Sequence, residues 1–132
     1  MKLVAALAIV LSACGGGTGG ECKVDGDCGD GVCARNGECL PESAVRSSRV
    51  TWTIRGMPAN ATTCAGSPNF YILFYASPGD TFGFEPVPCA AGVFSIDKLP
   101  KRFVSVEIGI EGRFEDDKAF DSQGNASFDL YP

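Results

Sequence analysis

The residues with the most distinctive chemistry in this chain are its seven cysteines. A cysteine sulfur can carry a lipid, pair with a second cysteine in a disulfide, or bind a soft metal ion as the thiolate. The sequence contains no histidine, so the commonest general base and the commonest metal ligand are both missing. The surroundings of each cysteine therefore indicate which chemistry is open to the protein.

Cys14 ends an N-terminal segment that has the three parts of a secretory signal peptide. Lys2 supplies positive charge, residues 3–11 are apolar, and Ser12 and Ala13 are small. The apolar run is roughly half the length that a membrane-spanning helix needs. The segment therefore predicts a cleaved export signal and not a transmembrane anchor.

The run Leu11-Ser12-Ala13-Cys14, followed by Gly15, resembles the lipobox of bacterial lipoprotein precursors. The resemblance implies that residues 1–13 are removed and that Cys14 carries diacylglyceryl and acyl chains, which anchor the protein in a membrane. In such lipoproteins an aspartate directly after the lipidated cysteine retains the protein at the inner membrane. Because Gly15 occupies that position here, the resemblance also implies that the protein is located at the outer membrane of the cell envelope. The alternative is a secreted bacterial or eukaryotic protein without lipid, and only in a eukaryote would the sequons at Asn60 and Asn125 be glycosylated.

Charge and composition exclude several classes of partner. The chain has 16 acidic and 11 basic residues, for a net charge of −5. An acidic protein without a lysine or arginine cluster is a poor ligand for nucleic acid and for anionic lipid surfaces. The glycine-rich residues 15–20 lack the Lys-Ser/Thr of a phosphate-binding loop and predict a flexible tether. The sequence predicts no cofactor and no nucleic-acid partner.

A group of four cysteines follows the tether: Cys22, Cys28, Cys33 and Cys39. The segment 22–41 has too few apolar residues for a core, so crosslinks must hold its shape. Nearly even spacing and an oxidising compartment favour disulfides over structural zinc. Four cysteines allow three pairings, and the spacing does not choose among them.

Three aspartates between these cysteines, Asp25, Asp27 and Asp30, are the weak calcium candidates of the chain. Alternating carboxylates near glycine suit a hard cation. However, Asp30 falls one position late for an EF-hand loop, and no glutamate closes the loop at the required distance. Turns in which an aspartate accepts backbone hydrogen bonds explain the same residues, so no metal site is predicted.

The run Cys22-Lys23-Val24-Asp25-Gly26-Asp27-Cys28 is similar to the small cysteine-rich modules of Dickkopf and EGF-like proteins. That resemblance implies the interleaved disulfides Cys22–Cys33 and Cys28–Cys39. Cys64 and Cys89 are then left for each other.

Beyond the knot, the chain predicts strands. Val50, Trp52 and Ile54 alternate with polar residues, which places Trp52 in the core, and residues 70–75 are apolar on both faces. Residues 103–110 alternate so that Val104, Val106, Ile108 and Ile110 are expected to point inward. Further strands are expected within residues 81–87, 93–96, 113–120 and 126–131.

The predicted fold is mainly β, with a small disulfide-rich knot followed by an antiparallel β-sandwich of six to seven strands. The fragment from Phe94 to Ile108 is similar to a strand-turn-strand unit of transthyretin-like and carboxypeptidase-regulatory-like sandwiches, with Lys101 and Phe103 in place of the usual glycine and tyrosine. The predicted parts are a signal peptide (1–13), lipidated cysteine and tether (14–21), knot (22–41), linker (42–48) and sandwich (49–132).

No pattern in the sequence predicts an enzyme. Glu115-Asp116-Asp117, the tight acidic cluster outside the knot, is expected to be a solvated hairpin tip and not a catalytic pair. We expect a binding module for a protein or glycan at the envelope, with an exposed aromatic patch formed by Tyr71, Tyr75, Phe82 and Phe84. The alternative is a structural or accessory subunit of an envelope complex, which would offer an unpaired edge strand.

Overall fold

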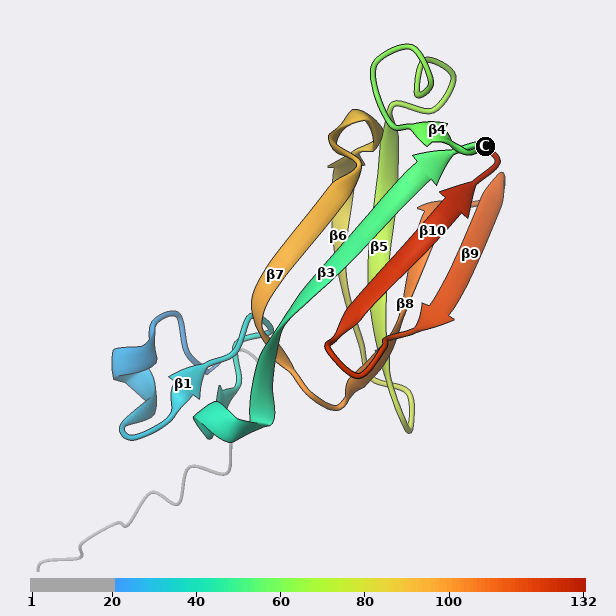
Figure 1. Ribbon diagram of the computed structural model, residues 1–132. Helices are drawn as coiled ribbons and strands as arrows, with labels where there is room; N and C mark the ends of the chain where they lie inside the picture. Colours follow the sequence, from blue (N-terminus) through green and yellow to red (C-terminus); the bar gives the residue numbers. More distant parts are fainter. Residues whose placement is uncertain (1–20) are drawn as a thin grey trace, which may run out of the picture.

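The computed structural model describes residues 21–132, which are mainly β (Figure 1). The predicted signal peptide, Cys14 and most of the tether lie outside these residues. Within residues 21–132, no helix has the length and apolarity needed to cross a membrane. The strands are β1 (Val32–Cys33), β2 (Cys39–Leu40), β3 (Val45–Ile54), β4 (Met57–Pro58), β5 (Asn69–Ala76), β6 (Thr81–Pro88), β7 (Val93–Pro100), β8 (Phe103–Ile110), β9 (Phe114–Ala119) and β10 (Asn125–Leu130), and the short 3-10 turns are η1 (Asp25–Cys28), η2 (Glu42–Ala44) and η3 (Cys89–Ala91).

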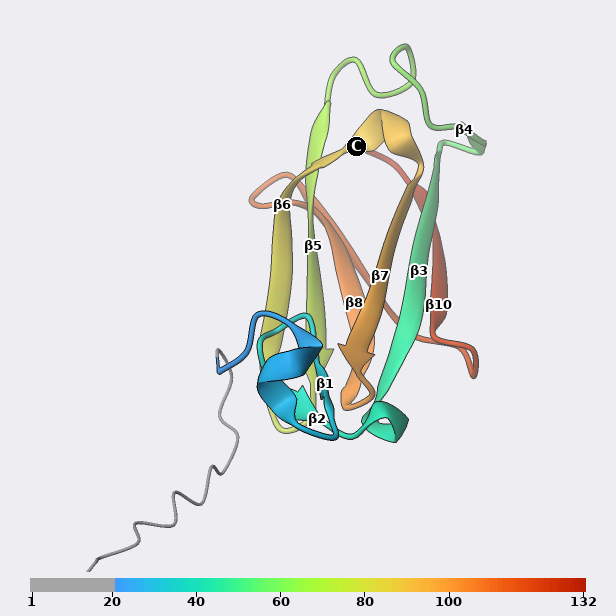
Figure 2. The same ribbon diagram turned by 90° about the vertical axis from the view of Figure 1, so that its left-hand side faces the viewer.

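Two sheets pack face to face in the larger part of the molecule (Figures 1 and 2). One contains β6, β5, β8 and β9 in that order, and all its pairs are antiparallel. The other is built around β3, with β10 on one side and β7 and the short β4 on the other. The predicted sandwich is confirmed, but β10 departs from the antiparallel expectation because it runs parallel to β3.

The core lies between the two sheets. Trp52 on β3 is 4% exposed, and its ring meets that of Phe70 on β5 edge to face at 6.1 Å. The indole Nε1 donates a hydrogen bond of 2.8 Å to the carbonyl oxygen of Cys89, so the one polar atom of this side chain is satisfied. Trp52 is therefore a core residue, as the alternation of β3 predicted.

Phe103 and Val104 differ from the inward pattern predicted for β8. Phe103 is fully buried, whereas Val104 is 52% exposed. The cause is an irregularity in the pairing with β5, where Ala76 lies opposite Phe103 and Tyr75 lies opposite Ser105. Val104 is the extra residue of this bulge, and an extra residue shifts the alternation of a strand by one position. The prediction was wrong for Val104, while Val106 and Ile108 are buried as expected.

Residues 42–48, predicted as a linker, belong to the folded structure. They form η2 and the beginning of β3, which starts at Val45. Val45 and Arg46 pair with the end of β7, and Ser48 is buried. Small polar residues resemble a linker in sequence, but here the neighbouring strand provides the backbone partners that make them a strand.

Three disulfides crosslink the described chain: Cys22–Cys33, Cys28–Cys39 and Cys64–Cys89. The first two are the interleaved pairs that the knot resemblance implied. The third joins the loop after β4 to η3. Cys89 is fully buried, and its carbonyl oxygen accepts the hydrogen bond from the Trp52 indole. The knot and the sandwich therefore each carry their own crosslinks.

The knot lies at one end of the sandwich (Figure 2), where ion pairs join it to Asp97 and Lys98 on β7 and to Arg102 in the turn that follows β7. Lys98 contacts Asp25 at 2.8 Å, Arg35 contacts Asp97 at 2.5 Å, and Arg102 contacts Glu38. The backbone adds a hydrogen bond of 3.1 Å from the Arg35 N–H to the Lys98 carbonyl. Because β8 starts beside these contacts, it runs from the knot toward the opposite end of the sandwich.

Candidate binding groove

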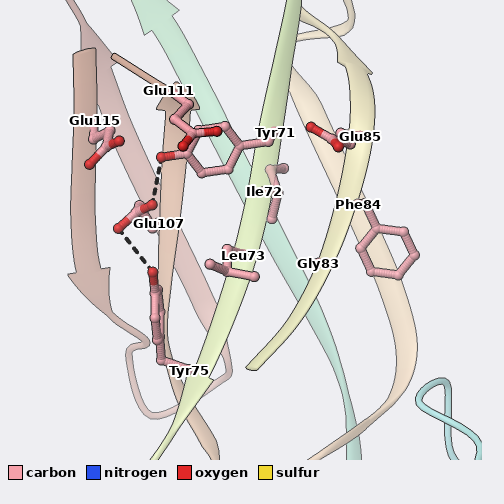
Figure 3. A pocket seen from close by; sticks show the side chains of 10 residues that line it. All are labelled: Tyr71, Ile72, Leu73, Tyr75, Gly83, Phe84, Glu85, Glu107, Glu111 and Glu115. Carbon is pink, nitrogen blue, oxygen red and sulfur yellow. Dashed lines mark hydrogen bonds between the residues drawn. The ribbon is translucent and has the colours of Figure 1, made fainter. Parts of the chain in front are cut away.

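A groove lies on the outer face of the sheet formed by β6, β5, β8 and β9 (Figure 3). Strand alternation on β5 buries Phe70, Ile72 and Phe74 in the core and turns the residues between them outward. The groove has a volume of about 580 Å³. Its lining residues are Tyr71, Ile72, Leu73, Tyr75, Gly83, Phe84, Glu85, Glu107, Glu111 and Glu115.

Glu107 stands between the two tyrosines of the groove. The Tyr71 hydroxyl donates a hydrogen bond of 2.6 Å to Glu107 Oε1, and the Tyr75 hydroxyl donates one of 3.1 Å to Oε2 (Figure 3). Glu107 on β8 lies opposite Leu73 on β5, so both tyrosines are its diagonal neighbours across the strands. Each carboxylate oxygen has a phenol partner, which holds both rings in place along the groove.

One glycine lines the groove, and a second lies next to it on β8. Gly83 lies opposite Leu73, and a Cβ at that position would stand 2.8 Å from the Leu73 Cδ1 atom. Gly109 lies opposite Tyr71, and a Cβ there would stand 2.3 Å from the Phe114 carbonyl oxygen. A contact under 3.0 Å would force backbone or side chain to move. The missing side chain of Gly83 leaves the hollow open, whereas Gly109 is buried and allows β9 to lie close to β8.

The groove is acidic. Glu85 comes from β6, Glu107 from β8, Glu111 from the turn after β8, and Glu115 from β9. Among residues 21–132, no lysine or arginine lines the groove. Four carboxylates therefore surround two phenol rings and one leucine without a basic residue to balance them.

The surroundings of the tyrosines raise their pKa values. Burial raises the pKa of the Tyr71 phenol far above its usual range, and the hydrogen bond to Glu107 and the negative charge of that carboxylate raise it further. The pKa of Tyr75 is raised by the same causes in the same order. Both phenols therefore stay protonated and neutral at physiological pH, as hydrogen-bond donors.

These shifts predict a specific response to alkaline pH. Unfolded tyrosines ionise near pH 10, whereas the folded ones hold their protons to higher pH, so the folded state binds more protons in this range. The contribution of Tyr71 and Tyr75 to the free energy of unfolding is therefore complete below about pH 10 and falls as the pH rises further. Glu107→Gln removes the carboxylate charge, so phenolate absorbance of the folded protein should appear at lower pH. Glu42→Gln, on the surface near the knot, is the control and should leave the tyrosine titration unchanged. If Tyr71 and Tyr75 of the wild-type protein ionised near pH 10, the contacts between these phenols and Glu107 would be contradicted.

The predicted aromatic patch is split between two faces. Tyr71 and Tyr75 lie in the groove, but Phe82 and Phe84 point into the core. The Phe84 ring lies 4.9 Å from that of Phe94 and 4.9 Å from that of Phe82. Alternation over residues 82–85 of β6 turns Phe82 and Phe84 inward and Gly83 and Glu85 outward, so the prediction was wrong for the two phenylalanines.

The acidic cluster Glu115-Asp116-Asp117 lies within β9 and not at a hairpin tip, because the turn is made by residues 111–113. Glu115 and Asp117 lie opposite Gly109 and Glu107 and face outward with them. Asp116 lies opposite the inward-facing Ile108. Glu107 itself was missed from sequence, although its polar type between the buried residues Val106 and Ile108 marks an outward position.

The three calcium candidates of the knot are not arranged as a metal site. Asp25 accepts hydrogen bonds from the Cys33 N–H and from Lys98, and Asp27 accepts from the N–H groups of Lys23 and Val24. These contacts, led by Lys98 for Asp25 and by the Lys23 N–H for Asp27, lower the pKa of both carboxyls. Asp30 is exposed. Among residues 21–132, the one group of three potential metal ligands is Cys22, Cys28 and Cys33, whose sulfurs are in disulfides.

Comparisons with known proteins give no relative on which to base a function. No protein-family model matches the chain, and neither does any curated protein or solved structure. The lipoprotein, Dickkopf and EGF-like, and transthyretin-like resemblances therefore stay predictions from short motifs.

Proposed function

We propose that this protein is a lipid-anchored, non-enzymatic binding module that captures a partner at the bacterial cell envelope through the groove on β5, β6, β8 and β9. The observation that carries the proposal is the pair Tyr71 and Tyr75, fixed on Glu107 beside an open hollow of about 580 Å³. Groups held in place before a ligand arrives lose little freedom on binding, which favours affinity.

The anchor and the groove lie on different parts of the chain. The lipobox-like residues and the tether end at residue 21, and the knot follows from Cys22. β8 leads from the knot end of the sandwich to Glu111, so the acidic end of the groove is remote from the tether. This arrangement supports a module that presents its groove away from the membrane.

The chemistry of the groove supports binding over catalysis. Phenols with raised pKa values are poor bases and poor nucleophiles at neutral pH. Glu107 already accepts a hydrogen bond on each oxygen, which makes it a fixed structural anion. The described disulfides leave their six cysteines without a free thiol.

The two edges of the groove sheet favour the groove over the alternative of an accessory subunit that docks on this sheet by strand addition. β6 carries Pro86 and Pro88, which cannot donate backbone hydrogen bonds to an added strand. β9 carries Glu115, Asp116, Asp117 and Lys118 in succession, and charged residues oppose pairing with another chain. Both edges of the groove sheet thus have the features that discourage augmentation.

Site-specific photo-crosslinking in living cells tests the proposal. A photo-reactive amino acid replaces Glu85 at the groove, Asp116 on the opposite side of β9, or Glu42 on η2 as the surface control. We expect one discrete adduct, identified by mass spectrometry, from position 85 and none from position 42. An adduct from position 116 without one from position 85 would favour the accessory subunit, and no adduct at any position would contradict both.

A further inference from the structure

The charge of the groove sheet extends beyond the groove itself. Asp117 lies next to Glu107 in the register of β8 and β9 and faces outward with Glu115. The basic residues nearest in sequence are engaged elsewhere. Lys118 donates to the Ser127 carbonyl and lies 5.3 Å from the ring centre of Phe128, and Arg113 donates to the Gly66 carbonyl. Among the described residues, no lysine or arginine therefore lines the groove to balance its carboxylates.

The floor of the groove has the spacing of an extended polypeptide. Tyr71, Leu73 and Tyr75 project from alternate positions of β5, so their side chains repeat about every 7 Å. Side chains on one face of an extended peptide have the same repeat. Aromatic rings and a leucine accept the methylene stems of lysine or arginine, and the ring faces attract the charged heads.

From this combination we infer that the ligand of the groove is an extended polypeptide segment of the partner with lysine or arginine at alternate positions. The inference rests on the proposed function of the groove as a binding site. The stems lie on Tyr71, Leu73 and Tyr75, and the charged ends reach Glu85, Glu107, Glu111 or Glu115 at the sides. A neutral glycan can stack on tyrosine, but it leaves the carboxylate charge without a counterpart.

Fluorescence anisotropy on the full-length protein in non-ionic detergent tests this inference. The probe is a labelled peptide of alternating lysine and threonine with blocked ends. The comparison ligands are the same peptide with glutamate in place of lysine and a neutral oligosaccharide. We expect binding of the lysine peptide only, and weaker binding as salt increases, because ion pairs at an exposed groove are screened.

A pair of double variants with equal change in net charge makes the test specific. Glu111→Gln with Glu115→Gln removes two carboxylates of the groove, and we expect about tenfold weaker binding of the lysine peptide. Glu42→Gln with Asp116→Asn removes two exposed carboxylates elsewhere, and we expect a change below about twofold. All four positions are exposed, and the replacements keep side-chain size, so both proteins should fold.

The outcomes separate the ligand class from the function of the groove. Equal losses in the two double variants would mean a non-specific charge effect and would overturn the inference. Binding of the oligosaccharide, unaffected by Glu111→Gln with Glu115→Gln, would overturn it in favour of a glycan. If the lysine peptide does not bind but the photo-crosslink from position 85 persists, the proposed function stands and the ligand class is wrong. If the lysine peptide binds but no crosslink forms from position 85 in cells, the preference of the groove for a cationic peptide stands and the proposed partner at the envelope is contradicted.

Discussion

Replacement of Cys14 by serine is expected to move the protein from the membrane fraction to the soluble fraction. Serine has no sulfur to receive the diacylglyceryl group that the lipobox resemblance implies. Each acyl methylene buried in a bilayer contributes about 0.8 kcal/mol, so two or more chains hold a protein stably, and their loss leaves no anchor. The acidic composition offers no electrostatic substitute at an anionic lipid surface.

Detergent phase separation and intact-mass measurement check this prediction. The wild-type protein should enter the detergent-rich phase, and its mass should equal that of the chain from Cys14 plus lipid. Thr18→Ser, a tether variant that keeps Cys14, is the matched control and should behave like the wild type. A Cys14→Ser protein that still enters the detergent phase, or wild-type protein with an unmodified Cys14 or an attached leader, would refute the anchor.

The neighbouring residues Phe103 and Val104 should differ sharply in their contribution to stability. Phe103→Ala removes a fully buried ring from between the sheets, and we expect the free energy of unfolding to fall by about 3–5 kcal/mol. Val104→Ala trims a side chain that is 52% exposed, and we expect a change within about 0.5 kcal/mol. The first loss is large against the 5–15 kcal/mol that is typical of folded domains.

Urea unfolding of the two variants measures this difference. Because Phe103→Ala removes a large part of the stability, Phe103→Leu gives a second, milder probe that should cost roughly 1–2 kcal/mol. If Val104→Ala were the more destabilising change, the bulge between β5 and β8 would be misplaced. The groove would then be in doubt as well, because Glu107 and Gly109 follow the bulge on the same strand.

Binding through the groove depends on the same alternation that builds the core. On β5, one set of residues (Phe70, Ile72 and Phe74) fills the sandwich, and the set between them forms the floor of the groove. β8 repeats this division, with Val106 and Ile108 inward and Glu107 outward. A stable core therefore holds Tyr71 and Tyr75 at fixed positions, which is the condition for recognising a ligand with regularly spaced side chains.

Local patterns in the sequence were enough to locate most strands of the sandwich. A hydrophobic period of two places Val50, Trp52 and Ile54 on one face of β3, whichever strands lie beside it, because side chains alternate along any strand. An even number of cysteines after Cys14 predicted disulfides, the knot resemblance then left Cys64 and Cys89 for each other, and the structure joins them. These inferences depend on neighbouring residues, on counting and on the resemblance of a short motif, and none of them requires the three-dimensional arrangement.

The strand partners and the groove depend on contacts that no local pattern records. The parallel pairing of β3 with β10 joins Arg49 to Asn125, and the bulge at Val104 appears only when β8 is aligned with β5. The groove takes Glu85, Glu107 and Glu115 from three strands, and each of them alone looks like an ordinary surface acid. Alternation and composition are properties of short segments, so the sequence determined which segments are strands. Which strands lie side by side depends on packing across the whole core, so the tertiary structure alone decided that these acids meet around two tyrosines.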